Sequence, residues 1–145
     1  MHVHGVIVDP INFPCILPSV VSLCFVWVDF GPINCLDCVI DVPALENLSF
    51  IRCKNTLYFD INAPKLRSLT IKSGSSNELG KFLPVSLDLR SISTLVLGGC
   101  VQGFVKEFTR MGFQLNVEYL KLSRFEEFYT ESDRSSSVLA HLLRL

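Results

Sequence analysis

The feature that most constrains the fold of this chain is a short apolar pattern that recurs along its length. Five segments carry apolar side chains in the order apolar-x-x-apolar-x-apolar, where x is any residue. The apolar positions are Val20, Leu23 and Phe25; Leu45, Leu48 and Phe50; Leu66, Leu69 and Ile71; Ile92, Leu95 and Leu97; and Val117, Leu120 and Leu122. Counted between first positions, the steps are 25, 21, 26 and 25 residues. All four steps lie within the window of about 20–29 residues that is typical of leucine-rich repeats.

The spacing of the three apolar positions has a direct physical meaning. The last two are separated by one residue, so their side chains point to the same side of a short strand. The first position, three residues earlier, enters the same interior from the turn that leads into the strand. One copy alone leaves these side chains uncovered, whereas stacked copies cover one another and align their strands in parallel.

The repeat therefore predicts an α/β fold, a leucine-rich-repeat solenoid with a curved parallel sheet and about five repeats. One domain covers residues 1–145, and the return segments are short helices or irregular. The predicted strands lie near residues 20–25, 45–50, 66–71, 92–97 and 117–122, with a terminal helix over about 136–145. No terminating signal follows that helix, so we expect a truncated array. The alternative is an ordinary α/β or all-β domain whose short strands are evenly spaced by chance.

Charge and composition exclude several classes of partner. Hydrophobic residues make up 49% of the chain and charged residues 19%, which is enough apolar surface to bury a core. The net charge is -1 and the Lys and Arg residues form no block, so we expect no nucleic-acid binding. Residues 10–28 are uncharged over nearly a membrane-spanning length, but Pro10, Pro14 and Pro18 interrupt them. The alternative interpretation is a small membrane-associated protein that uses residues 10–28.

The cysteines and histidines give no catalytic or metal-binding pattern. Six cysteines without a secretion signal fit a reducing compartment, the cytoplasm or nucleus. Cys35-x-x-Cys38 has no second ligand pair for zinc and lies in a return segment, so a structural role is expected. Histidines occur only near the two ends of the chain, and neither a nucleophile elbow nor a phosphate-binding glycine loop is present. We expect no enzyme, no catalytic residue, no cofactor and no metal site.

One stretch resembles a known family. Residues 41–71 contain Pro43-Ala44-Leu45-Glu46-Asn47-Leu48 and then Ile61-Asn62-Ala63-Pro64-Lys65-Leu66-Arg67-Ser68-Leu69-Thr70-Ile71. This is similar to the repeat region of plant F-box proteins with leucine-rich repeats, including those that end in an FBD domain. The Ala-Pro-x-Leu step is the most specific part of the likeness. At the first step, Val42 precedes Pro43 where the family often has Cys.

The resemblance implies a protein-binding scaffold like the substrate-recognition region of an F-box ubiquitin-ligase receptor. The chain contains neither an F-box nor an FBD region, so direct binding to a Skp-type adaptor is not expected. The protein partner cannot be named from the sequence. A truncated, non-functional remnant of such a protein is the alternative.

If the scaffold prediction is right, partners bind the outward side chains of the predicted sheet. Strand alternation places the residue between the last two apolar positions of each copy outward, with further outward neighbours two residues to either side. The predicted partner-binding residues are Ser49, Thr70, Lys72, Val96, Tyr119 and Lys121. Tyr119 and Lys121 are the preferred pair, because aromatic and cationic side chains more often anchor a partner.

Overall fold

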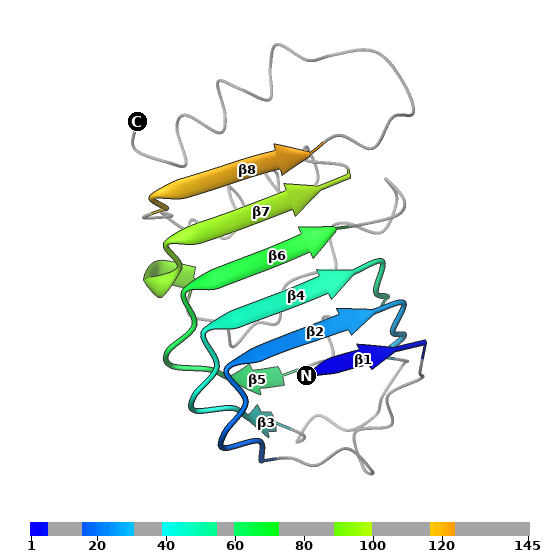
Figure 1. Ribbon diagram of the computed structural model, residues 1–145, viewed down its shortest axis with the longest axis vertical. Coiled ribbons are helices and arrows are strands. Elements are labelled where there is room, and N and C mark those ends of the chain that lie inside the picture. The colour runs from blue at the N-terminus through cyan, green and yellow to red at the C-terminus, as the bar shows by residue number, and fades with distance from the viewer. Residues whose placement is uncertain (6–15, 31–38, 55–59, 73–88, 100–116, 124–145) are drawn as a thin grey trace.

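A computed structural model describes residues 1–5, 16–30, 39–54, 60–72, 89–99 and 117–123. Their dominant element is a six-stranded sheet in which every neighbouring pair of strands is parallel (Figure 1). In spatial order its strands are β1 (His2–His4), β2 (Ser22–Val26), β4 (Asn47–Ile51), β6 (Ser68–Lys72), β7 (Thr94–Gly98) and β8 (Tyr119–Ser123).

Helix is scarce in the part of the chain that the structure describes. The one helical element there is the 3-10 turn η3 (Leu89–Ser91), directly before β7. None of the described helical structure is long and apolar enough to cross a membrane. Within the uncharged segment 10–28, residues 22–26 form strand β2.

The strand register aligns the repeated apolar positions across the sheet. Leu23 is paired with Leu48, Leu48 with Leu69, Leu69 with Leu95, and Leu95 with Leu120. The last apolar position of each copy forms a second row in the same way, from Phe25 to Leu122. The predicted alignment of these leucines on adjacent parallel strands is therefore present.

Both apolar rows point into one core behind the sheet. Leu23, Leu48, Leu69 and Leu95 are at most 2% exposed, as the alternation of inward and outward side chains along a strand requires. The rings of Phe25 and Phe50 stack with their centroids 5.5 Å apart, and Phe30 meets both rings edge-on. Aromatic contacts of this kind contribute about 0.5–1.5 kcal/mol beyond the burial of their area.

In each of the five copies the strand begins two residues after the first apolar position. In the second and third copies this first position closes a turn that leads into the strand. In the third copy the Leu66 N–H donates to the Ala63 carbonyl at 3.1 Å, which closes a turn with Pro64 in its second position. The same turn closes from Leu45 to Val42 in the second copy, around Pro43. Proline favours this position because its ring presets φ. The turn directs buried Leu45 and Leu66 into the core.

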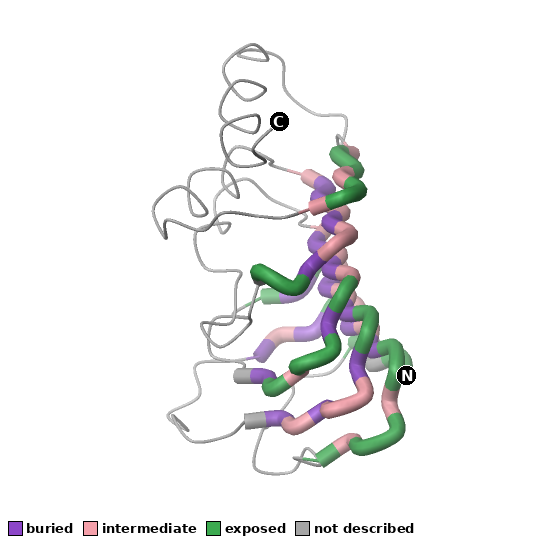
Figure 2. The backbone as a smooth tube through the Cα atoms, turned by 90° about the vertical axis from the view of Figure 1, so that its left-hand side faces the viewer, coloured by how far each residue is buried: buried purple, intermediate pink, exposed green. Residues whose placement is uncertain are grey.

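A second, two-stranded parallel sheet precedes these turns. It consists of β3 (Val39–Asp41) and β5 (Asp60–Asn62), and an isolated bridge joins Ile16 to Asp41. In Figure 2 the large sheet stands along one side of the molecule, and the described turns and short strands extend away from it. We expected only short helices or irregular structure in the return segments, and at these two places that expectation was wrong. Buried Ile40 and Ile61 pair across this sheet and close the core from that side.

Two predicted features lie outside the described residues. They are the terminal helix over 136–145 and the Cys35-x-x-Cys38 pair.

Candidate functional site

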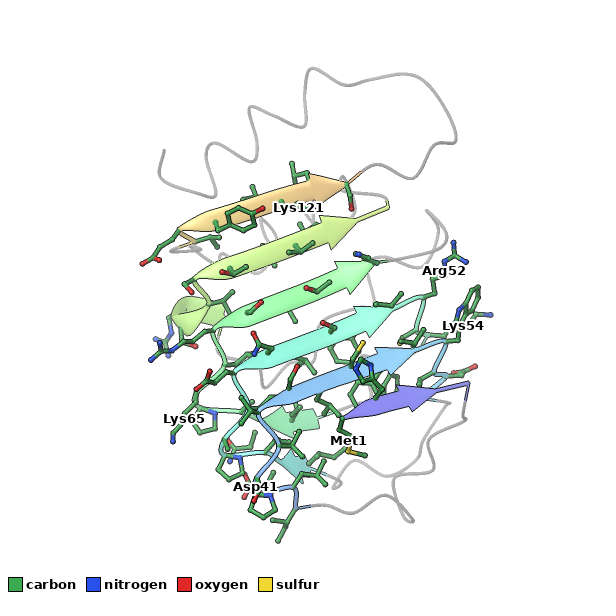
Figure 3. All side chains as sticks on the ribbon, in the orientation of Figure 1. Met1, Asp41, Arg52, Lys54, Lys65 and Lys121 are labelled. Carbon is green, nitrogen blue, oxygen red and sulfur yellow. The ribbon has the colours of Figure 1, made fainter. Side chains whose placement is uncertain are left out.

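The face of the large sheet that points away from the core is the candidate site, and we call it the outward face. It consists of the first, third and fifth residues of five strands: Ser22, Cys24 and Val26; Asn47, Ser49 and Ile51; Ser68, Thr70 and Lys72; Thr94, Val96 and Gly98; and Tyr119, Lys121 and Ser123. Apart from the buried Gly98, these residues are half-buried or exposed. Figure 3 looks onto this face.

The structure brings most of the predicted partner-binding residues into one row. Ser49, Thr70, Val96 and Lys121 are register partners on four successive strands. The first three are half-buried between their neighbours, whereas Lys121 is exposed. Small hydroxyl side chains thus occupy the middle of the face.

The preferred pair Tyr119 and Lys121 lies on β8, at one end of the strand order. Tyr119 is 55% exposed, and its register partner on the neighbouring strand β7 is Thr94. Lys72 stands apart from both, in the row nearest the carboxyl ends of the strands. The predicted residues therefore share one face, but they do not converge on a single point.

The charge on the outward face has one sign. Of its fifteen residues, Lys72 and Lys121 are the cations, and none is Asp or Glu. Acidic side chains occur instead just before the strands, where Glu46 and Glu118 are exposed. Arg67 is exposed at the equivalent position before β6, so the amino edge carries charges of both signs, whereas the charged residues of the face itself are both cations.

Gly98 creates the space in which the Lys72 side chain lies. A Cβ built on Gly98 would lie 3.0 Å from Cγ of Lys72 and 2.8 Å from Oγ of Ser123. The Ser123 hydroxyl in turn donates to the carbonyl of Leu97 at 3.4 Å. A side chain at position 98 would displace one of these neighbours, so the glycine holds the Lys72 stem close against the sheet.

At four equivalent positions the residue directly after a strand takes a left-handed backbone conformation, and we call these positions corners. φ is +64° at Gly5, +58° at Trp27, +52° at Arg52 and +96° at Gly99. Each of these residues donates its N–H to a carbonyl of the next strand in the sheet, for example Trp27 to Ile51 at 2.9 Å and Arg52 to Lys72 at 2.6 Å. Positive φ costs a residue with a Cβ about 1 kcal/mol, and glycine avoids this cost.

Trp27 and Arg52, the two corners without glycine, are in contact with each other. The guanidinium carbon of Arg52 lies 4.8 Å from the centroid of the Trp27 ring, within the range of a cation–π interaction. Trp27 is 54% exposed although it is a large aromatic side chain. Sequence reasoning missed this pair. The available signal was that the chain's single Trp and its first cation each follow a strand directly.

The two described cysteines are free thiols that stay protonated. Burial raises the pKa of the Cys53 thiol, and its Sγ–H donates to the carbonyls of Phe25 at 3.4 Å and Ile51 at 3.6 Å. Burial also raises the pKa of Cys24, although the N-terminal ammonium and Lys72 offset part of this effect. A nucleophilic thiolate is disfavoured at both positions.

Metal chemistry has no visible basis in the described ranges. Across residues 1–5, 16–30, 39–54, 60–72, 89–99 and 117–123, no group of three or more His, Cys, Asp or Glu side chains is arranged to hold an ion. The arrangement that remains is a polar, partly cationic sheet face with an aromatic corner.

Comparison with known proteins gives no match to a family model, to a curated protein or to a solved structure.

Proposed function

We propose that this chain is a leucine-rich-repeat module whose outward face binds a protein partner. Its role would resemble that of the substrate-recognition region of an F-box ubiquitin-ligase receptor. The link to ubiquitin ligases rests on the sequence likeness of residues 41–71, and the binding role rests on the sheet.

One observation carries the proposal. Five leucines, from Leu23 to Leu120, are register partners on adjacent parallel strands, although 21 to 26 residues separate each from the next. A parallel ladder of this kind needs a return segment of similar length in every copy, which is the construction principle of a repeat protein.

Local features repeat with the same step and support the proposal. The Val21 carbonyl accepts the N–H groups of Glu46 and Asn47, and the Glu46 carbonyl accepts those of Arg67 and Ser68. Leucine-rich repeats often carry Asn or Cys three residues after the last apolar position. Cys53 stands there, and its thiol donates to the Phe25 carbonyl of the preceding copy.

The surface chemistry of the outward face favours a protein partner. Protein interfaces are enriched in aromatic side chains and depleted in acids relative to the rest of the surface. Tyr119 supplies an exposed ring, and none of the fifteen residues of the outward face is Asp or Glu. The free thiols of Cys24 and Cys53 fit a reducing compartment, so we place the protein in the cytoplasm or nucleus.

The experiment is a selection of displayed peptides on the immobilised chain, followed by affinity measurements on purified variants. Tyr119→Ala removes an exposed ring and Thr70→Arg fills the middle of the face. We expect each to weaken the selected peptides at least about fivefold, which corresponds to about 1 kcal/mol. Circular dichroism checks that both variants stay folded.

Lys65→Ala is the control, because Lys65 is exposed in the turn before β6, away from the outward face (Figure 3). It should leave the affinities unchanged. Folded Tyr119→Ala and Thr70→Arg variants that bind every selected peptide as well as the parent chain does would contradict the proposal.

A further inference from the structure

Positive charge gathers at the carboxyl edge of the sheet around the exposed tryptophan. Trp27, Arg52, Lys54 and Lys72 form what we call the carboxyl-edge cluster. Arg52 and Lys54 are exposed and Lys72 is half-buried. Asp29 is the acid nearby, with its backbone bridged to Lys54. Among the described residues this edge therefore carries three cations and one acid, while the whole chain has a net charge of -1.

We infer that the carboxyl-edge cluster binds an extended acidic segment of the partner protein. The inference rests on the proposed function, since the cluster adjoins the outward face at Lys72 and specifies the chemistry of a partner that binds this face. Carboxylates of the segment would pair with the ammonium and guanidinium groups, and its neighbouring side chains would pack on the Trp27 ring.

Charge complementarity selects this occupant. Hydrogen bonds between carboxylates and cationic donors are roughly twice as strong as neutral ones. The outward face has no acid that would repel such a segment, and its cations stand at and near the carboxyl edge. At the opposite edge exposed Glu46 and Glu118 stand in one row with exposed Arg67, so acids and a cation are mixed there. The carboxyl edge differs in combining several cations with an exposed aromatic ring.

The cluster is already arranged before a ligand arrives. The Arg52 backbone is tied to the Lys72 carbonyl, and its guanidinium lies over the ring of Trp27. The Lys72 stem is held over Gly98. Binding pays for the ordering of mobile side chains, so cations that are held in place lose less entropy.

The spacing of the cations suits an extended chain that crosses the strands. Neighbouring strands are about 4.8 Å apart and a strand rises about 3.3 Å per residue, so Lys72 on β6 is separated by roughly 12 Å from Lys121, which lies two strands away and two residues nearer the amino edge. An extended peptide advances about 3.3–3.6 Å per residue. Acidic residues about four positions apart, as a peptide of alternating Glu and Ser provides, would therefore reach both cations.

Trp27 provides a direct readout, because it is the single Trp of the chain and belongs to the cluster. The probe is a synthetic peptide of alternating Glu and Ser, titrated at low ionic strength. We expect a saturable change in Trp27 fluorescence that weakens as salt rises, since added salt screens exposed charges. The peptide of alternating Gln and Ser should give no change.

Two substitutions with the same charge change separate site binding from general attraction. Lys72→Glu reverses a cation of the cluster, whereas Lys65→Glu reverses an exposed cation in the turn before β6. We expect the first to raise the dissociation constant at least about tenfold and the second to change it by less than about twofold. Arg52→Gly, which suits the positive φ, should also weaken binding at least about threefold.

Equal weakening by Lys72→Glu and Lys65→Glu would overturn the inference, because only net charge would then matter. Absence of any response to the Glu peptide would overturn it as well. The inference and the proposed function can fail independently. If the selected peptides carry no acids but their binding depends on Tyr119 and Thr70, the acidic segment is refuted and the proposed function is supported.

Discussion

Truncation of Leu69 to alanine tests the stacked core most directly. Leu69 is 0% exposed and lies at the middle of the ladder, with Leu48 on one side and Leu95 on the other. The substitution removes three carbon atoms from the interior, which costs about 2.4 kcal/mol at about 0.8 kcal/mol per buried carbon. The cavity left behind adds to this, since hydrogen-bonded strands on both sides limit the collapse of the site. We expect a total of about 3–5 kcal/mol.

The assay is urea unfolding followed by circular dichroism, with the free energy of unfolding extrapolated to water. Leu122→Ala is the matched control, because it removes the same atoms from a position on β8 that is 44% exposed. Because the side chain is only about half buried there, about half of the roughly 2.4 kcal/mol for loss of buried carbon atoms applies, and we expect a cost of about 1 kcal/mol. A Leu69→Ala variant that loses no more stability than Leu122→Ala would refute the stacked-core reasoning.

Three further predictions concern the corners, the turns and the buried thiol. At Arg52, where φ is +52°, the variant Arg52→Gly should be about 1 kcal/mol more stable than Arg52→Ala by urea unfolding, and equal stabilities would argue against backbone strain at this corner. Pro64→Ala should cost about 0.4–1 kcal/mol in the same assay, because the unfolded chain gains freedom while the turn stays compatible with alanine; a gain in stability would contradict this. Burial raises the pKa of the Cys53 thiol above that of the unfolded chain, so the stability it contributes is complete below the ordinary thiol pKa and is lost as the pH rises through the raised one. Unfolding free energies measured across the alkaline range should fall in the parent and fall less in Cys53→Ala; parallel pH profiles would contradict the assignment.

The stacking of the large sheet could be predicted because it depends on side-chain periodicity alone. Leu48 and Phe50 alternate with polar residues, and the same order returns at Leu69 and Ile71. Residues that alternate in this way must share one side of a strand. The strand bounds were less predictable, since Leu66 has the same apolar character in a turn as it would have in a strand.

The small sheet of β3 and β5 left too little signal in the sequence. Ile40 is followed by Asp41 and buried Val42, and Ile61 by Asn62 and a small alanine. One apolar pair in a polar segment does not distinguish a three-residue strand from an irregular turn. Only the stacking of one copy on the next gives each short strand a hydrogen-bonding partner.

The carboxyl-edge cluster could not be predicted because the backbone there is set by the sheet. Gly5 and Gly99 show the residue type that a left-handed corner favours, whereas Trp27 and Arg52 are intrinsically poor choices. At all four corners an N–H bonded to the next strand imposes the conformation whatever the side chain is. Because the neighbouring strand fixes the backbone at a corner, the side chain there can serve binding instead of backbone preference. Strained backbone positions of this kind cluster at functional sites. Trp27 and Arg52 occupy adjacent corners and are in contact. This contact between two strained positions therefore favours the carboxyl edge as the place where the partner binds.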